Sequence, residues 1–277
     1  SHFARTGSSA FDIYVKCGAK YVYHDTFMPT LGDHYEAISR FKVPGMKDVM
    51  LHFPTYSDVK NLYIGVAEGS RIEHSAPYRY LKPVVYYGSS ITQGACASRP
   101  GNAYEAIISN DLDCDFINLG FSGSALAEEA ITDYINSLDM SVFVMDYDHN
   151  APNPEHLERT HEAFFKKIRA SHPDLPVIMI SRPTFEEGYG GPHAYGISVI
   201  PPENEMLRCR EVVFRTYMNA VNAGDRSVYF IDGASLFNGP HADLCTVDGV
   251  HPNDAGFLRM ADRIGSFVSA ALPEDPA

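Results

Sequence analysis

The sequence predicts an α/β protein, in which a three-layer α/β/α domain over residues 82–277 follows a small antiparallel β unit over residues 1–81. Before Tyr80, short runs with strand character are separated by turn residues such as VPGM, and few segments show a helical period. After Tyr80, apolar runs alternate with longer amphipathic stretches. This alternation is typical of a parallel sheet that carries helices on both faces.

The amino-terminal unit contains five runs rich in β-branched and aromatic residues, and turn residues separate them. We expect these runs to form the strands of the antiparallel sheet. They lie at residues 11–16, 20–25, 35–43, 48–54 and 61–67.

The second region contains five apolar strand candidates, at residues 84–88, 115–120, 142–148, 176–182 and 228–233. Five amphipathic helix candidates lie among them, at residues 104–110, 126–137, 154–171, 203–223 and 253–271. The longest irregular stretch covers residues 184–205 and follows a strand candidate. Loops of that length are often functional, and whether this one acts as a lid is left open.

Composition narrows the class of partner. Hydrophobic residues make up 45% of the chain and charged residues 21%, which is typical of a globular protein. The formal charge of −13 argues against nucleic acid or an anionic membrane as a partner, because both require a basic face. The amino terminus lacks the basic flank and apolar core of a signal peptide, and five cysteines without CxxC spacing favour reduced thiols. These features predict a cytoplasmic protein.

One apolar strand candidate ends in a glycine–serine turn, in the sequence VVYYGSSITQG at residues 84–94. In α/β folds, such turns place functional groups at the carboxyl ends of strands. No lysine follows Gly94, so the turn is not a phosphate loop, and Thr92 replaces the last glycine of a G-x-S-x-G elbow. A serine nucleophile here needs a base and an orienting acid from elsewhere in the chain. The alternative is a simple helix cap by Ser89 or Ser90.

Two of the twelve histidines, His149 and His251, have an aspartate three residues before them. Asp146 ends an apolar run, whereas Asp248 lies in the polar turn DGVHPND ahead of the last helix candidate. In that turn, the Asp248 carboxylate can reach Nδ1 of His251 and leave Nε2 pointing outward, as a general base requires. Because an aspartate at this spacing often forms only a local hydrogen-bonded cap, the spacing alone does not show that Asp248 and His251 are an acid and base.

Four separate blocks, GSSITQG, NLGFSGSA, DYDHN and DGVHPND, occur in this order along the chain. In order and approximate spacing they resemble the four blocks of the SGNH (GDSL-type) hydrolases, over about residues 82–273. Upstream, SSAFDIYV resembles the G-x-D-L-Y element of one bacterial branch of acylhydrolases and acetylesterases. That resemblance implies a longer amino-terminal β domain, of which residues 1–81 would be a part.

The resemblance implies a role for each matching residue. Ser90 would be the nucleophile, Asp248 the acid and His251 the base. The backbone N–H groups of Ser90 and Gly123 and the side chain of Asn150 would form the oxyanion hole. The chain departs from the family pattern at two points, because a serine replaces the aspartate of G-D-S and the block G-x-N-D reads DYDHN.

Three further residues are candidates for contact with substrate. Arg99 follows the glycine–serine turn, and Arg182 ends a strand candidate. Either could hold a polar group of the substrate, and a salt bridge between loops is the alternative for both. His193, in the long glycine-rich loop, could approach substrate or remain solvated.

The resemblance implies a serine esterase that removes short acyl groups, acetyl above all, from a carbohydrate or another polar substrate through an acyl-enzyme intermediate. The same site could instead transfer the acyl group to an alcohol. A metal-dependent phosphoesterase that uses Asp146, Asp148, His149 and His251 is a less favoured alternative, because side chains that alternate around a strand end would not all face one ion. A non-catalytic carbohydrate-binding protein is a further alternative.

The expected partner is a small-molecule or oligosaccharide ester, with no metal or other cofactor, no nucleic acid and no membrane. Homo-oligomer formation is left open.

Overall fold

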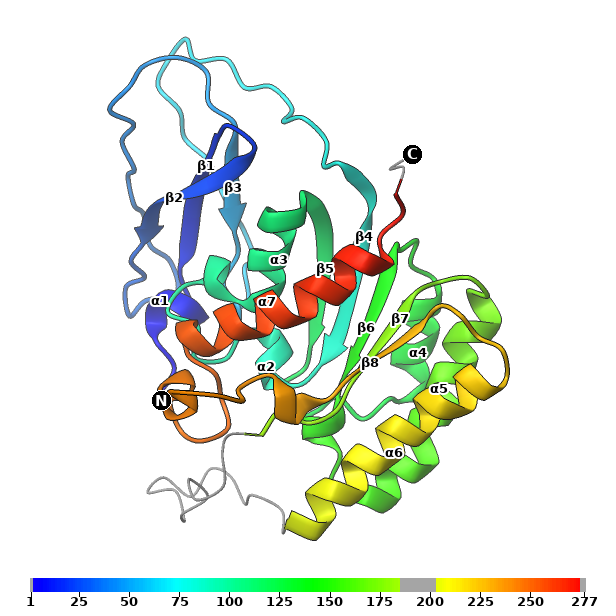
Figure 1. Ribbon diagram of the computed structural model, residues 1–277. Helices are drawn as coiled ribbons and strands as arrows, with labels where there is room; N and C mark the ends of the chain where they lie inside the picture. Colours follow the sequence, from blue (N-terminus) through cyan, green and yellow to red (C-terminus); the bar gives the residue numbers. More distant parts are fainter. Residues whose placement is uncertain (1, 185–202, 275–277) are drawn as a thin grey trace.

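The computed structural model describes residues 2–184 and 203–274 and arranges their strands in two sheets (Figure 1). The smaller sheet is antiparallel, with the order β2-β1-β3, and the larger is parallel, with the order β5-β4-β6-β7-β8. The smaller sheet contains β1 (Phe11–Cys17), β2 (Lys20–Phe27) and β3 (Val49–His52). The larger contains β4 (Tyr80–Gly88), β5 (Cys114–Gly120), β6 (Val142–Asp146), β7 (Val177–Ile180) and β8 (Val228–Ile231). The predicted fold class is therefore confirmed.

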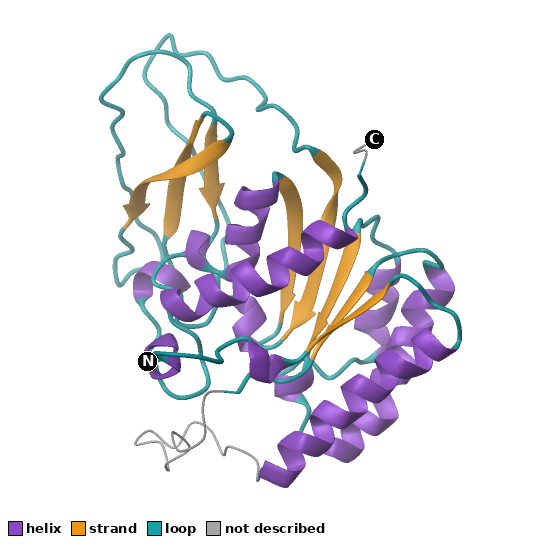
Figure 2. Cartoon of the chain, viewed as in Figure 1, coloured by secondary structure: helices purple, strands orange, loops and turns teal. Residues whose placement is uncertain are grey.

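Helices cover both faces of the parallel sheet (Figure 2). The longer helices are α3 (Tyr104–Leu112), α4 (Glu129–Asn136), α5 (Pro154–Ser171), α6 (Glu203–Asn222) and α7 (Asp254–Ala271). The short ones are α1 (Arg5–Ser8), α2 (Ser90–Gln93), η1 (Pro100–Asn102), η2 (Asp148–Asn150), η3 (Gly233–Ser235) and η4 (Ala242–Cys245).

Side chains of β4 point alternately into the two hydrophobic cores, one on each face of the parallel sheet. Val84 and Tyr86 pack into the core shared with α3 and α7. Val85 and Tyr87 pack into the opposite core, shared with α4, α5 and α6. Both faces of the strand are buried because helices cover both, which explains the continuous apolar run in the sequence.

The helix predictions hold closely where a cap fixes the end. Asn153 and Asn253 precede α5 and α7, and each side chain accepts a hydrogen bond from a backbone N–H in the first turn. The predicted helix over residues 126–137 begins three residues later than expected, at Glu129. Ala127 has a φ of 58°, and its N–H donates to the Tyr87 hydroxyl at 2.9 Å. This left-handed residue delays the helix.

The strands expected at residues 35–43 and 61–67 are absent, and that prediction is wrong. Both segments run as loops (Figure 2). Their apolar side chains face solvent, with Ile38 77% exposed and Tyr63 88% exposed. In the described residues no second layer packs over them, so the strand-like composition buries too little surface to offset the entropy of ordering.

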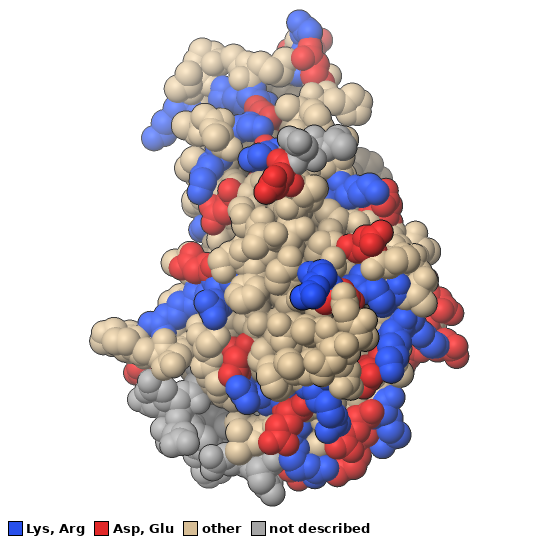
Figure 3. Space-filling model, turned by 45° about the vertical axis from the view of Figure 1, so that its right-hand side comes forward, with Lys and Arg blue, Asp and Glu red and all other residues tan. Residues whose placement is uncertain are grey.

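The surface is mixed in charge on the face shown in Figure 3, where basic and acidic side chains lie among one another. Within residues 2–184 and 203–274, none of the helices has both the length and the apolar character that a membrane crossing needs.

Candidate active site

The glycine–serine turn follows β4, which lies between β5 and β6, at the carboxyl edge of the parallel sheet. Gly88 pairs with Gly120 in β5 and with Asp146 in β6, and α2 begins at Ser90 immediately beyond it. A Cβ on Gly88 would overlap Thr92 Oγ1 and the Asp146 carbonyl, and one on Gly120 would overlap the backbone of Gln93. These two glycines therefore allow α2 to lie directly against the sheet. Ser89 caps α2 by accepting a hydrogen bond from the Ile91 N–H at 3.1 Å.

Ser90, His251 and Asp248 are brought together by the fold. Ser90 Oγ lies 2.9 Å from His251 Nε2, and His251 Nδ1 lies 2.7 Å from Asp248 Oδ2. Both the serine and the histidine are buried, at 9% and 7% exposure. This is the geometry in which an imidazole can take the proton of a hydroxyl while a carboxylate orients the ring.

The acid and base share a single turn ahead of α7. Asp248 Oδ1 accepts hydrogen bonds from the backbone N–H groups of Val250 and His251, at 2.9 and 2.7 Å. Burial acts to raise the pKa of Asp248, but the hydrogen bonds from the His251 side chain and backbone outweigh it and hold the pKa well below its usual range. Asp248 is thus an ionised carboxylate fixed beside Nδ1.

The two other predicted oxyanion donors follow the strands on either side of β4. Gly123 lies in the turn after β5, with a φ of 70° and an exposed backbone. Asn150 ends the η2 turn after β6, and its Oδ1 accepts from the Ala125 N–H at 3.1 Å. That bond directs the amide oxygen into the Gly123 turn and leaves the Nδ2 group as the donor end. Because β5, β4 and β6 are adjacent, all three segments meet at the same edge of the sheet.

Arg182 and Arg99 both make contacts within the protein. The Arg182 backbone N–H donates to Asp148 Oδ2 at 2.7 Å, and its Nη2 donates to the Asp148 carbonyl at 2.8 Å. Its side chain is only 9% exposed. These bonds hold the turn that carries Asn150. Arg99 contacts the amino-terminal β unit, near Asp12. Each arginine thus forms a salt bridge, Arg182 with Asp148 in the η2 turn and Arg99 with Asp12 on β1, and contact of either with substrate stays a prediction. His193 lies outside the described residues.

Two of the acidic side chains considered as metal ligands, Asp146 and Asp148, have other partners. Asp146 Oδ2 accepts from Thr92 Oγ1 and the Tyr104 hydroxyl, both at 3.3 Å, and burial raises its pKa to about 8. Asp148 pairs with Arg182 instead. Burial lowers the pKa of His149 well below its usual range, with a further contribution from the charge of Arg182.

In the described part of the chain, the ligand atoms of His2, Cys96 and His251 lie within 4.8 Å of one another. Burial, reinforced by the charge of Asp248, raises the pKa of the Cys96 thiol to about 12. His251 is already engaged through both nitrogens.

Sequence reasoning missed the residues that the amino-terminal segment brings to the site. His2 Nε2 lies 2.9 Å from Asp248 Oδ2, and the Phe3 ring centroid lies 5.5 Å from that of His251. Tyr56 packs against Phe3 at 5.0 Å between centroids. No local pattern marks these residues, because their position depends on the docking of the β unit.

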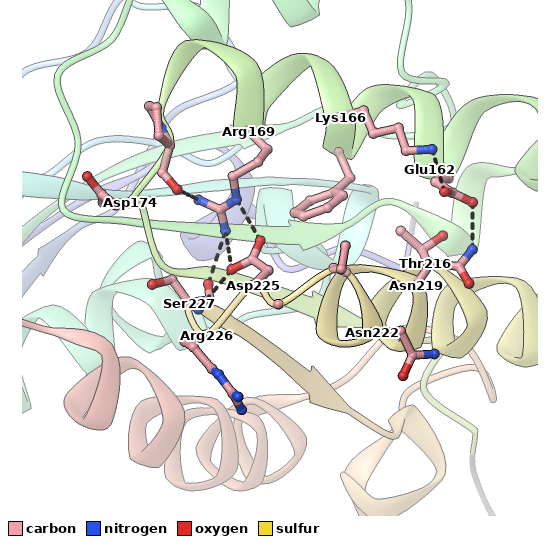
Figure 4. Close-up of a pocket in the computed structure, with 15 residues that line it drawn as sticks. Glu162, Lys166, Arg169, Asp174, Thr216, Asn219, Asn222, Asp225, Arg226 and Ser227 are labelled. Carbon is pink, nitrogen blue, oxygen red and sulfur yellow. Dashed lines mark hydrogen bonds and ion pairs between the residues drawn. The ribbon is translucent and has the colours of Figure 1, made fainter.

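A hollow of about 830 Å³ lies between α5 and α6, beside the amino ends of β7 and β8 (Figure 4). This is the opposite edge of the sheet from Ser90. Four of its charged groups form two ion pairs, in which Arg169 bonds Asp225 at 2.8 Å and Lys166 lies 2.7 Å from Glu162. It holds no nucleophile beside a base among the lining residues.

Comparisons with known proteins agree with this geometry. A family model described as GDSL-like lipase/acylhydrolase matches residues 81–269, and one described as the N-terminus of SGNH-hydrolase-type esterases matches residues 1–72. A protein from Bacteroides ovatus ATCC 8483 described as a GDSL-like lipase is 28% identical, with a TM-score of 0.83 over 97% of this chain and 76% of that one. No curated protein matches the chain in sequence.

Two more distant solved structures share the fold. A salicylyl-acyltransferase from a tetracycline biosynthetic pathway is 16% identical, with a TM-score of 0.69 over 95% of this chain and 73% of that one. A family two carbohydrate esterase from Clostridium thermocellum, in complex with cellohexaose, is 14% identical, with a TM-score of 0.60 over 96% of this chain and 86% of that one.

Proposed function

The chain belongs to the GDSL-like lipase/acylhydrolase family and is a carboxylic ester hydrolase, and on that premise we propose that it is a serine esterase that removes short acyl groups, acetyl above all, from a carbohydrate or another polar alcohol. The observation that carries the proposal is the hydrogen-bonded series from Ser90 through His251 to Asp248. It provides a nucleophile, a base and an orienting acid at one point.

In the acylation step, Ser90 Oγ attacks the ester carbonyl carbon while His251 Nε2 takes the hydroxyl proton. The tetrahedral intermediate then collapses, the bond to the leaving alcohol breaks, and the imidazolium gives its proton to the alcohol oxygen. Asp248 stays ionised throughout and stabilises the imidazolium. Its lowered pKa supports this role, because the carboxylate must keep its charge when the ring gains one.

Water completes the cycle. His251 takes a proton from a water molecule, whose oxygen attacks the acyl carbon, and the same ring then returns the proton to Ser90 Oγ as the carboxylic acid leaves. In both halves the negative charge develops on the former carbonyl oxygen. The N–H groups of Ser90 and Gly123 and the amide of Asn150 would stabilise it, each by about 2.7–4 kcal/mol as judged from the cost of removing one donor.

The short acyl group follows from the sequence resemblance to the branch of acylhydrolases and acetylesterases, and two comparisons support an ester of a polar alcohol. The family match places the chain among acylhydrolases. A protein of the same fold was captured with cellohexaose, which suggests a saccharide as the alcohol. Transfer of the acyl group to an acceptor alcohol is a second candidate, because the fold is also that of a salicylyl-acyltransferase.

A panel of p-nitrophenyl esters of rising chain length and of acetylated sugars tests the proposal. We expect the highest kcat/KM with acetyl esters, no effect of a chelator, and loss of activity in Ser90→Ala. Full activity in Ser90→Ala would contradict the serine mechanism. Sensitivity to the chelator with indifference to a serine-directed phosphonate would favour the metal-dependent phosphoesterase. Product ratios measured with added alcohol separate transfer from hydrolysis.

A further inference from the structure

The amino-terminal β unit makes a buried charged contact with the segment that follows α2. Asp12, in β1, is fully buried, and its Oδ2 accepts a hydrogen bond from the Gly101 N–H at 3.0 Å. The same oxygen lies 3.5 Å from Nε of Arg99. Burying a carboxylate is costly unless it is paired and hydrogen-bonded, so these contacts are what keep Asp12 in place.

Aromatic side chains of the same unit enclose the arginine. Arg99 Nε donates to the Tyr14 hydroxyl at 3.3 Å, and its guanidinium carbon lies 3.9 Å from the centre of the Tyr23 ring. Asp12 and Tyr14 are two residues apart on one strand and therefore face the same side. A Cβ at Gly101 would overlap the Tyr14 ring, so the backbone approaches this face as closely as glycine allows.

The contacted segment, residues 98–101, is also bound to the first residue of α7, the helix that follows the His251 turn. Ser98 donates through its backbone N–H to Asp254 Oδ1 at 2.8 Å and through its hydroxyl to Asp254 Oδ2 at 2.5 Å. Asp254 begins α7, three residues after His251. The segment therefore joins β1 on one side to the start of α7 on the other, three residues beyond His251.

A second bridge links the β unit to the oxyanion side. Gln93, at the end of α2, donates through Nε2 to the Thr55 carbonyl at 3.1 Å. Its Oε1 accepts from the Ser122 N–H at 2.8 Å, in the turn that holds Gly123. The β unit thus contacts α2 directly and reaches the Gly123 turn through the Gln93 side chain.

We propose that Asp12, Tyr14 and Arg99 are positioning residues, through which the amino-terminal β unit holds the His251 turn in register with Ser90. The role in catalysis rests on the proposed function, whereas the mechanical link does not. A small displacement of a base from its nucleophile costs far more rate than binding, because the reacting atoms must lie near contact distance. The effect is therefore expected in kcat.

Kinetics of three variants test the catalytic part. Asp12→Ala removes both contacts and should lower kcat roughly 10- to 100-fold, with KM within about twofold of wild type. Asp12→Asn can still accept the Gly101 N–H and should recover part of the loss, and Tyr14→Phe should lose least. Inactivation by a serine-directed phosphonate should slow by the same factors as kcat. Asp48→Asn is the matched control, because Asp48 bonds Tyr21 and Ser75 inside the same unit.

Hydrogen exchange tests the link without relying on activity. In Asp12→Asn, the amides of residues 98–101 and 248–254 should exchange faster than in wild type, and those of Asp48→Asn should not. Unchanged exchange at 248–254 would overturn the proposal, as would wild-type kcat in folded Asp12→Asn and Tyr14→Phe. If wild type shows no Ser90-dependent hydrolysis, the proposed function fails, and the exchange data alone still decide whether the link exists.

Discussion

In the parallel sheet, β6 and β7 are buried along their whole length, whereas β2 of the amino-terminal sheet has only exposed and half-buried residues. The two regions also differ in their loops. In the α/β region, Asn153 and Asn253 cap the helices that follow two of the connections, while the β unit contains long segments with exposed apolar residues such as Leu31 and Ile72. Because helices cover both faces of the parallel sheet, the apolar runs of the α/β region are enough to determine where its strands lie.

The β unit obtains part of its order from contacts with the other region. Thr55 bonds Gln93, and Asp12 contacts Arg99 and Gly101, all of them on the connections of the nucleophile turn. The comparison therefore assigns the reacting groups to one region and their positioning to both. Four predictions test this assignment, and they are given in order of decreasing effect.

Asp248→Asn should give the largest effect, because the reacting groups lie entirely in the α/β region. The asparagine keeps the shape of the side chain but no longer holds Nδ1–H of His251 with a carboxylate, so kcat should fall about 10⁴-fold. Steady-state kinetics on p-nitrophenyl acetate measure the change, with Ser90→Ala as the background. A loss smaller than that of Asp12→Asn would break the division.

Asn150→Ala should lower kcat by about 10²- to 10³-fold, the usual cost of one oxyanion donor. Asn153→Ala is a matched control close in sequence, because Asn153 caps α5 through the His156 N–H at 2.9 Å. The control should lose about 1 kcal/mol of stability and keep its kcat. Equal losses of kcat in both variants would show that the loss comes from disturbing this segment of the chain and not from removing the Asn150 amide.

Buried and exposed isoleucines sharpen the contrast in packing. Ile108 of α3 is 1% exposed and packs against α7, whereas Ile38 of the β unit is 77% exposed. Ile108→Ala should cost about 2–5 kcal/mol in the free energy of unfolding. Ile38→Ala should stay within about 0.5 kcal/mol of wild type. Denaturant titration measures both, and a large cost at Ile38 would reveal a core in the β unit.

Asp146→Asn should change how stability depends on pH. Burial raises the pKa of Asp146 to about 8, from its usual value near 3.8, so the folded protein keeps a proton that the unfolded chain releases. Stability contributed by this group therefore falls as pH rises between these two values. The Tm of Asp146→Asn should gain a few degrees on wild type between pH 5 and pH 8. A difference that stays constant over this range would mean that folded Asp146 is ionised.

Much of the α/β region follows from local patterns. The apolar runs marked the parallel strands, and the resemblance singled out Ser90, Asp248 and His251, which the fold brings together. The predicted roles of these residues remain predictions. The partners of Arg99 and the position of Phe3 beside His251 could not be foreseen, because they depend on how one region docks on the other.

The turn from Thr246 to Pro252 closes on itself through a bridge between its two ends, and both the carboxylate and the imidazole lie inside it. The base and its orienting acid are therefore held in one local turn, and His2 and Phe3 contact them from outside it. The long-range distance that the rest of the fold must set is the one between this turn and Ser90. A change in the activity of such an enzyme should therefore require only a shift of this turn relative to Ser90, and the three side chains can stay as they are.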